Sequence, residues 1–203
     1  ILMVDNCSDD DSVSFVKKNY PQIRIAVNKE NTGYAGGANA AIRESRGEYV
    51  LIANPDILFE PDFLEKAVAP LKRDASIAAV SCKLRKWNLE EGKKTQILDS
   101  AGLVMYRSRR CVDRGQGELD KGQFEKAEEV FGVSGACALY RKSALDAVAI
   151  EGQFFDEDFF MYKEDIDLSW RLRLAGLKIW YEPSALAYHA RGTSAVLRDT
   201  LMK

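Results

Sequence analysis

The sequence predicts an α/β fold: one domain with a doubly wound, mostly parallel sheet, an irregular excursion and a small antiparallel part. Apolar strand-like stretches alternate with helical ones over residues 1–84, in the order β-α-β-α-β-α-β. This alternation is typical of parallel sheets covered by helices. The length of 203 residues suits a single domain with a sizeable core, and no internal repeat or low-complexity linker divides the chain.

The central stretch is residues 49–53, an apolar run with two β-branched residues that is typical of a strand buried on both faces. It leads into Asn54-Pro55-Asp56, where Pro55 cannot continue a ladder and forces a turn. Asp56 therefore lies at the carboxyl end of a buried strand, where open α/β sheets bind ligands. It would either hold a divalent cation against a diphosphate or cap the helix that starts near Pro61.

Two strands are expected before this one, over residues 1–4 and 23–27. Between them a run of turn and N-cap residues predicts a helix over 13–19, which Pro21 stops. Asp5 follows the first strand directly. Its carboxylate is either a hydrogen-bond acceptor for a base or ribose or a residue of an Asx-turn.

Residues 28–39 form a Gly-rich segment that leads into a helix expected over 40–45. Three glycines at a strand-to-helix turn allow a ligand to approach the backbone, and a helix N-terminus favours anions. The spacing Gly-x-x-Gly-Gly is not the G-x-G-x-x-G dinucleotide fingerprint. A ligand-binding loop and a tight turn with close helix packing both fit.

A helix is expected over residues 61–73, with proline at its first turn, and a buried strand over 77–84. Residues 85–130 are polar and Gly-containing, with only short apolar pieces. Such a stretch in a compact domain is typically functional or mobile, and we expect an excursion with one or two hairpins that could form a lid. Four arginines in it would meet phosphate or form a solvated face: Arg107, Arg109, Arg110 and Arg114.

Residues 131–141 predict a strand whose small side chains leave space for a ligand or for close packing of a helix. Residues 154–167 then hold six carboxylates interleaved with five aromatic side chains. A helix that contains Glu164 in its first turn and ends at Gly176 follows. The helix dipole explains one acid in that turn. Six acids among aromatics instead indicate a pocket with stacking surfaces and a general base.

A last strand is expected over residues 177–181, closed by Glu182-Pro183. The only histidine, His189, comes after it. A lone histidine is more often a hydrogen-bonded structural residue than a metal ligand. Its position after a strand end, like that of Asp56, also fits a metal ion shared with Asp56.

Composition narrows the class of protein. Hydrophobic residues make up 46% and charged residues 30%, as in ordinary soluble domains. The net charge of −2 does not favour a broad nucleic-acid or membrane-binding field. No apolar run approaches the roughly 18 residues that span a bilayer. Four widely spaced cysteines without a C-x-x-C pair indicate reduced thiols in a cytosolic protein.

Six motifs, taken in order, closely resemble the family 2 inverting glycosyltransferases with the GT-A (Rossmann-like) fold. The nearest match is the rhamnosyltransferase-like branch that builds bacterial surface polysaccharides, and the resemblance covers nearly the whole chain. The motifs are Val-Asp-Asn-x-Ser-x-Asp, Asn-x-Gly-Tyr-Ala-Gly-Gly-Ala-Asn, Asn-Pro-Asp, Ser-Gly-Ala-x-x-Leu-Tyr-Arg, Phe-Asp-Glu-x-Phe-Phe-Met-Tyr-x-Glu-Asp-x-Asp-Leu-x-x-Arg and His-x-x-Gly-x-Ser.

The resemblance implies roles for five residues on the donor side. Asp5 would contact the nucleotide base. Asn31, Gly33 and Asn39 would shape the nucleotide pocket. Asn54 stands where many members carry the first acid of the D-x-D motif, and it would contact the ribose or the metal.

The resemblance also implies the metal ligands and the catalytic acids. Asp56 matches the second acid of the D-x-D motif and would bind Mg²⁺ or Mn²⁺, with His189 as a further ligand. Asp165 would be the general base, and Glu164 would help to hold the acceptor.

The implied activity is transfer of a sugar, with a deoxythymidine-diphosphate-linked rhamnose as the suggested donor, to a glycan or lipid-linked acceptor with inversion. A lipid-linked acceptor would place this cytoplasmic enzyme at the inner face of the membrane. Residues 1–203 begin at what resembles the family's second strand, so an N-terminally incomplete domain is expected. Restoring an upstream segment would then improve nucleotide binding.

Three alternatives stay open on the residues alone. A nucleotidyltransferase that makes sugar nucleotides would need a Gly-rich, Arg- or Lys-bearing loop after an N-terminal strand, and these residues contain none. The glycine spacing and the acid-rich aromatic segment disfavour a dinucleotide-dependent oxidoreductase. A non-catalytic sugar-nucleotide-binding module would share the fold without turnover.

Overall fold

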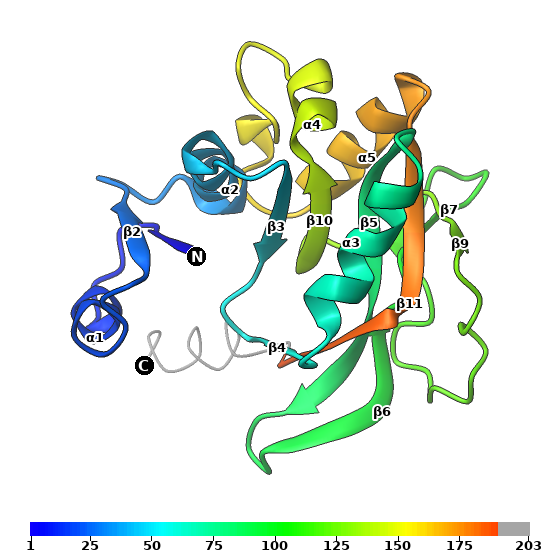
Figure 1. Cartoon of the computed structure of the whole chain (residues 1–203), viewed down its shortest axis with the longest axis horizontal. Coiled ribbons are helices and arrows are strands. Elements are labelled where there is room, and N and C mark those ends of the chain that lie inside the picture. Colours follow the sequence, from blue (N-terminus) through cyan, green and yellow to red (C-terminus); the bar gives the residue numbers. More distant parts are fainter. Residues whose placement is uncertain (191–203) are drawn as a thin grey trace.

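The structure is a computed structural model that describes residues 1–190. Helices cover both faces of a seven-stranded sheet, and two further sheets have two strands each (Figure 1). In chain order the elements are β1 (Leu2–Asp5), α1 (Ser12–Asn19), β2 (Arg24–Val27), α2 (Gly33–Glu44), β3 (Tyr49–Ala53), β4 (Ile57–Phe59), α3 (Phe63–Arg73), β5 (Ile77–Asn88), β6 (Lys93–Ser100), β7 (Leu103–Met105), β8 (Cys111–Asp113), β9 (Glu128–Glu129), β10 (Cys137–Arg141), α4 (Lys142–Val148), the 3₁₀ helix η1 (Glu157–Phe159), α5 (Glu164–Leu174) and β11 (Lys178–His189).

The large sheet has the strand order β3-β10-β5-β11-β4, with β6 paired to β5 and β9 paired to β11. The main strands β3, β5 and β11 run in the same direction, because β10 is antiparallel to both β3 and β5 while β11 is parallel to β5. Strands β4, β6 and β9 are antiparallel to their neighbours. The predicted α/β sheet with an antiparallel part is thus confirmed, with β10 inserted antiparallel between two of its main strands.

Two apolar layers flank this sheet. Alternation along β10 sends Ala138 and Tyr140 into the layer formed with α2, α4 and α5, and Cys137 and Leu139 into the layer under α3. Phe63 of α3 is 1% exposed. Burying a side chain of this size contributes roughly 1.5–3 kcal/mol. Buried apolar side chains therefore anchor the helices to both faces of the sheet.

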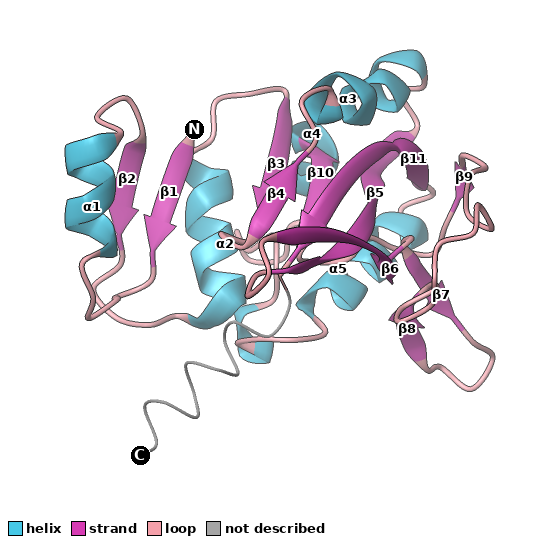
Figure 2. Cartoon of the chain, turned by 90° about the horizontal axis from the view of Figure 1, so that it is seen from below, coloured by secondary structure: helices cyan, strands magenta, loops and turns pink. Residues whose placement is uncertain are grey.

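Strands β1 and β2 form a parallel pair of their own, in which Leu2 lies opposite Arg24. Within the described part of the chain, neither strand is hydrogen-bonded to the large sheet. Helix α2 lies between β1 and β3 and contacts both of them (Figure 2). The Gly-rich segment therefore connects the two parts of the molecule.

The excursion over residues 85–130 contains the expected hairpins. Strand β5 continues to Asn88 and turns back into β6, and β7 and β8 form a second hairpin. Of the four arginines predicted to form a basic cluster, Arg114 points inward instead, and its guanidinium lies 4.8 Å from the ring centre of Tyr181. The other three arginines are exposed near the β7–β8 turn, as a solvated face would be: Arg107, Arg109 and Arg110.

The Gly-rich segment differs from its prediction, because helix α2 begins at Gly33 rather than near residue 40. Glycine lowers helix propensity, and the sequence pattern therefore favoured a loop. Packing outweighs that preference. A Cβ on Gly36 would lie 2.5 Å from the side chain of Thr32, so the close turn requires glycine there.

The predicted boundaries of two strands were also wrong. Strand β10 begins only at Cys137, because the preceding residues form turns. Strand β11 does not stop at Glu182-Pro183 but continues to His189. Its register with β5 shifts between Glu182 and Leu186. A proline is tolerated within a strand at such a bulge, where the ladder is already interrupted.

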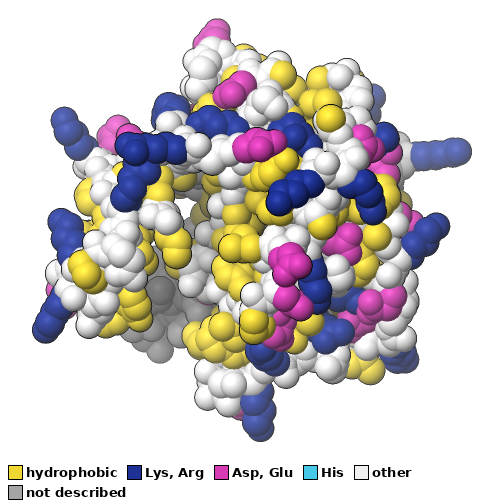
Figure 3. All heavy atoms as spheres, in the orientation of Figure 1, with side chains coloured by type: hydrophobic (Ala, Val, Ile, Leu, Met, Phe, Trp, Pro, Cys, Tyr) yellow, Lys and Arg dark blue, Asp and Glu magenta, His cyan; other side chains and the backbone are white. Residues whose placement is uncertain are grey.

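In the described part of the chain, no helix has the length and apolar character needed to cross a membrane. On the face shown in Figure 3, basic and acidic side chains are interspersed rather than collected into a field of one sign. This face therefore does not have the field of one sign that typically binds nucleic acid.

Candidate active site

The six carboxylates of residues 156–167 have different environments. Four of them cap a turn, pair locally or face solvent: Asp156, Glu157, Asp158 and Asp167. Asp167, for example, pairs with Arg171 at 2.8 Å. The remaining two, Glu164 and Asp165, begin helix α5 and lie against the segment that precedes β10.

Two backbone N–H groups hold the Asp165 carboxylate. The Gly135 N–H donates to Oδ2 at 2.9 Å, and the Ile166 N–H donates to Oδ1 at 2.8 Å. Burial raises the pKa of Asp165, and these two hydrogen bonds oppose that rise by favouring the charged form. The result is a carboxylate with a fixed direction and an increased basicity, as a general base requires.

Glu164 is more deeply buried, with 5% of its surface exposed. Burial raises its pKa to about 7. The Oε2 atom has no hydrogen-bond partner among the described residues. Gly135 closes this side of the site: a Cβ there would lie 3.4 Å from the carboxylates of both Glu164 and Asp165, and its carbonyl accepts a hydrogen bond from the Tyr34 hydroxyl.

Because Glu164 is buried, the stability of the protein should depend on pH. The folded protein keeps the Glu164 proton up to a pH of about 7, whereas the unfolded chain loses it near 4.5. Folding therefore becomes less favourable as the pH rises through this window, by up to about 3 kcal/mol. The variant Glu164→Gln lacks this titration. We expect its unfolding free energy, relative to wild type, to increase between pH 4.5 and pH 8.

Urea denaturation at intervals of half a pH unit would measure this difference. The exposed Glu90→Gln variant is the comparison, and it should follow the wild-type curve. A Glu164→Gln variant whose stability difference stays constant with pH would show that the buried carboxyl group does not titrate in this window.

Asp56 and His189 lie together at the other end of the site. Strand β4 pairs with β11 so that Ile57 is opposite His189, and the Ala190 N–H donates to the Asp56 carbonyl at 3.1 Å. This ladder places the imidazole Nε2 of His189 3.3 Å from the Asp56 carboxylate. On its other side, Nδ1 lies 2.8 Å from the carboxylate of Asp99, which is completely buried.

This pair fits a divalent cation. In an octahedral site with bonds of about 2.1 Å, neighbouring ligand atoms are about 3 Å apart, close to the spacing between Asp56 and His189. Within residues 1–190, no group of three or more His, Cys, Asp or Glu side chains is arranged to hold a metal ion. Mg²⁺ commonly binds through one or two carboxylates together with phosphate oxygens and water. Substrate oxygens would therefore complete the coordination.

The two ends are linked through the segment before β10. The Asn54 N–H donates to the Ala136 carbonyl at 2.9 Å, and the adjacent Gly135 holds Asp165. Asn54 is followed directly by the turn that contains Asp56. The structure thus brings Asp56 and His189 into direct contact and connects Asp165 to the same edge of the sheet.

Asp5 is also buried, at 4% exposure, and one of its oxygens accepts a hydrogen bond from the Ser8 N–H at 3.2 Å. This bond reaches the backbone three residues on, whereas the bond of an Asx-turn reaches two residues on, so Asp5 makes a local turn contact of another kind. The other oxygen, Oδ1, is buried without a hydrogen-bond partner among the described residues. Buried acceptors normally have a donor, so this atom is a candidate for accepting one from a ligand.

The remaining donor-side residues organise the backbone. The Asn31 side chain accepts from the Gly33 N–H and from Asn6. The fully buried Asn39 amide donates to the Phe155 carbonyl and accepts from the Phe155 N–H. With its further bonds to neighbouring residues, all of its hydrogen-bonding capacity is used. Asn39 therefore holds the acid-rich segment in place, and any effect on a nucleotide pocket would be indirect.

Replacing Gly33 by alanine should destabilise the protein. Gly33 has φ +70, and a Cβ would lie 2.3 Å from the Phe160 carbonyl oxygen. The left-handed conformation alone costs a non-glycine residue about 1–2 kcal/mol, and the clash adds to it. We therefore expect a loss of at least about 2 kcal/mol in denaturant unfolding. Gly37 lies in the same helix with nothing closer than 3.7 Å, so Gly37→Ala should be neutral or stabilising.

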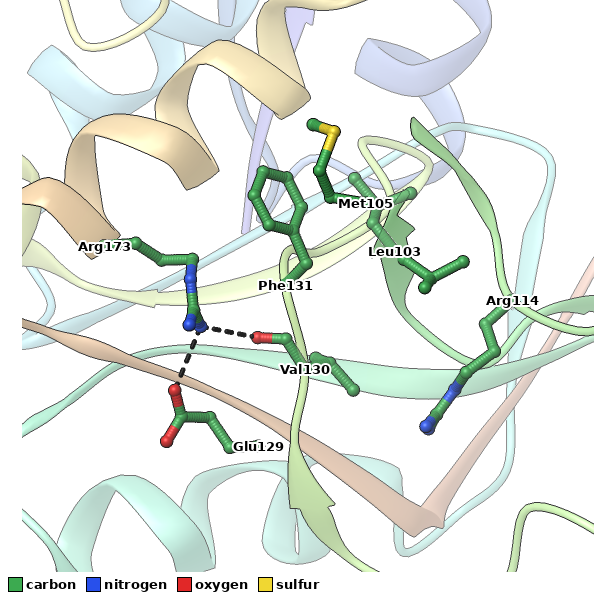
Figure 4. Close-up of a pocket in the computed structure, with 8 residues that line it drawn as sticks. Leu103, Met105, Arg114, Glu129, Val130, Phe131 and Arg173 are labelled. Carbon is green, nitrogen blue, oxygen red and sulfur yellow. Dashed lines mark hydrogen bonds and ion pairs between the residues drawn. The ribbon is translucent and has the colours of Figure 1, made fainter. Parts of the chain in front are cut away.

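Two hollows on the surface are lined by other residues than those of the site. One of about 390 Å³ is lined by β7, the segment around Phe131 and the end of α5 (Figure 4). Arg173 on its rim is paired with Glu129 at 3.0 Å and donates to the Val130 carbonyl. A second hollow of about 430 Å³ is lined partly by Lys83 and Arg85, both paired with Asp120. Because the charged side chains that line them are already paired, neither hollow is a better candidate for the active site than the residues described above.

The sequence alone did not assign a role to three groups that organise the site: Asp99, the Gly135 N–H and the amide of Asn6. The signal for Asp99 was present, since a carboxylate directly after the apolar residues Ile97 and Leu98 must find a partner if that stretch is buried. The other two belong to motifs quoted above, but the sequence did not reveal their roles, because they act through contacts with distant residues. Gly192 and Ser194 of the last motif lie outside the described residues.

Comparison with known proteins identifies the family. The model of glycosyl transferase family 2 matches residues 1–149. An N-acetylglucosaminyl-diphospho-decaprenol L-rhamnosyltransferase from Mycobacterium tuberculosis is 29% identical over 217 residues, which cover 96% of this chain and 67% of the relative. A poly-beta-1,6-N-acetyl-D-glucosamine synthase from Staphylococcus aureus is 28% identical, with 93% of this chain and 42% of the relative covered.

Solved structures agree on the fold. GalNAc-T7, crystallised with UDP, GalNAc and Mn²⁺, matches with a TM-score of 0.73 at 12% identity over 93% of this chain and 36% of its own. A mannosyltransferase from Pyrobaculum calidifontis, in complex with GDP-Man and Mn²⁺, matches with a TM-score of 0.64 at 21% identity over 96% of this chain and 49% of its own. The chain therefore belongs to glycosyl transferase family 2, has the GT-A fold and resembles the rhamnosyltransferase-like members of the family.

Proposed function

We propose that this domain transfers a sugar from a nucleoside-diphosphate sugar to a hydroxyl group of a glycan or lipid-linked acceptor, with inversion at the anomeric carbon. Two observations support the proposal: the contact between Asp56 and His189, and an Asp165 carboxylate that is held by two backbone N–H groups and connected to the same edge of the sheet. Family membership supports the reaction class.

In the proposed reaction, Asp165 takes the proton of the acceptor hydroxyl. The oxygen electron pair forms a bond to the anomeric carbon from the face opposite the diphosphate, and the carbon–oxygen bond to the diphosphate breaks. A single in-line displacement inverts the configuration and requires no second nucleophile. A divalent cation at Asp56 and His189 would supply positive charge against the leaving diphosphate.

On the donor side, the unpartnered Oδ1 of Asp5 would accept a hydrogen bond from the base, and Asn54 would contact the ribose or the metal. On the acceptor side, Glu164 would help to hold the incoming sugar. The segment before it exposes four large apolar side chains that could pack against a sugar ring or a lipid: Phe159, Phe160, Met161 and Tyr162.

A deoxythymidine-diphosphate-linked rhamnose is the donor we propose, because the mycobacterial relative is a rhamnosyltransferase. The name of that relative includes a decaprenol-linked diphosphate sugar, which supports a lipid-linked acceptor here. Such an acceptor would bring this domain to the inner face of a membrane in the synthesis of a surface polysaccharide.

The test is a thermal-shift panel of nucleoside diphosphates and their sugar conjugates, with and without Mn²⁺. A nucleotide at 100 times its Kd should add about 2.7 kcal/mol of stability. We expect the stabilising compounds to be nucleoside diphosphates and to require the cation. Donor turnover then separates the alternatives: release of nucleoside diphosphate indicates glycosyl transfer, whereas pyrophosphate release from a nucleoside triphosphate indicates a nucleotidyltransferase. Binding without turnover on any acceptor would indicate a binding module.

A further inference from the structure

The imidazole of His189 lies between two carboxylates, one from a strand and one from a turn. Nδ1 lies 2.8 Å from Asp99 on β6, and Nε2 lies 3.3 Å from Asp56 in the turn before β4. His189 is 5% exposed and Asp99 is 0% exposed. Strand β5 separates β6 from β11 in the sheet, so Asp99 reaches the ring across a neighbouring strand.

A β-bulge directs Asp99 to this position. Leu84 of β5 is opposite Ser100 of β6, and the next residue, Arg85, is opposite Leu98. Asp99 is therefore the extra residue of β6 at this register shift. Bulges commonly turn one side chain away from the regular alternation, which here places a completely buried carboxylate beside the ring.

This arrangement determines which ring nitrogen carries the hydrogen. Nδ1 is 2.8 Å from Asp99, whereas Nε2 is 3.3 Å from Asp56, so in a neutral ring the shorter contact is the hydrogen bond that Nδ1–H donates to Asp99, and Nε2 keeps its lone pair for a cation shared with Asp56. We propose that Asp99 is a positioning residue that holds His189 in the Nδ1–H tautomer, so that Nε2 and Asp56 together bind a divalent cation. This inference rests on the metal site of the proposed function.

The first measurement is the tautomer itself. The chain has one histidine, so long-range ¹H–¹⁵N correlation spectra of protein labelled with ¹⁵N-histidine report His189 alone. At pH 8 we expect the Nδ1–H tautomer in the wild-type chain, and a mixture of both tautomers in Asp99→Asn. The wild-type spectrum needs no variant, no metal and no substrate. A wild-type ring in the Nε2–H tautomer would overturn the proposal, even if Asp99→Asn failed to fold.

The second measurement is a titration with Mn²⁺ alone, followed through paramagnetic broadening of the His189 ring signals. Loss of a residue that orients a metal ligand typically weakens metal binding about 10–100-fold, and we expect Asp99→Asn to shift the Mn²⁺ midpoint by that factor. Asp120→Asn is the matched control. Its carboxylate is equally buried, with a side chain 1% exposed, and it pairs with Lys83 and Arg85 instead. This control should lower stability without changing the tautomer or the Mn²⁺ midpoint.

The results of these two measurements distinguish failure of the positioning role of Asp99 from failure of the proposed function. An unchanged tautomer in Asp99→Asn, or a Mn²⁺ midpoint within twofold of wild type, contradicts the positioning role. If glycosyl transfer is not observed but the tautomer and the Mn²⁺ shift are as expected, the proposed function fails while the assignment of Asp99 stands.

Discussion

Replacing Asp165 by asparagine is expected to reduce glycosyl transfer about 10²–10⁴-fold, corresponding to about 3–5 kcal/mol in the activation free energy. The neutral amide cannot take the proton of the acceptor hydroxyl. Donor binding should stay within about twofold of wild type, because Asp165 is anchored to Gly135 and Ile166 rather than to the Asp56–His189 pair. The measurements are turnover with saturating acceptor and calorimetric titration with the nucleoside diphosphate and Mn²⁺.

The variant also has a predictable structural cost. An amide has one acceptor oxygen, so one of the two N–H groups that hold Asp165 loses its partner, which costs about 1–3 kcal/mol of stability. Thermal unfolding should show whether the variant is folded at the assay temperature. Asp158→Asn changes an exposed acid of the same segment and should retain activity. Wild-type turnover in a folded Asp165→Asn variant would assign the base to another residue.

Replacing Asp56 by asparagine should abolish the dependence of donor binding on the divalent cation. The amide keeps the shape of the side chain, but it lacks the charge that a hard cation requires. Loss of an outer-shell residue weakens metal affinity about 10–100-fold, and loss of a direct ligand should exceed that range. Turnover should fall with it, because the nucleoside diphosphate would then leave without a compensating positive charge.

Calorimetric titration of the nucleoside diphosphate at increasing Mn²⁺ concentrations tests this expectation. Asp62→Asn is a suitable comparison, since Asp62 is an exposed acid close in sequence that pairs with Lys66 at 2.6 Å. It should preserve the response to Mn²⁺. If Asp56→Asn responded to Mn²⁺ as the wild type does, the cation would bind elsewhere.

The sequence alone predicted the fold class and the family, because both depend on short-range patterns. Apolar runs and the turn residues between them mark strands and helices wherever they pack. The Asn54-Pro55-Asp56 turn after a buried strand was recognisable in the same way, since proline ends a ladder in any context. The acid-rich segment stood out because its composition is unusual. Helix α2 and strand β11 were placed less well, because tertiary packing decided where each of them began or ended.

Only the tertiary structure decided which acids meet. It separated Glu164 and Asp165 from four neighbouring carboxylates, and it placed Asp99 beside His189 across an intervening strand. Local propensity contains no information about such contacts, because they join residues far apart in the chain through the register of the strands. A bulge that shifts this register by one residue changes which side chain faces the site. The chemical character of each side chain could therefore be predicted from the sequence, whereas its partner was determined by the pairing of the strands.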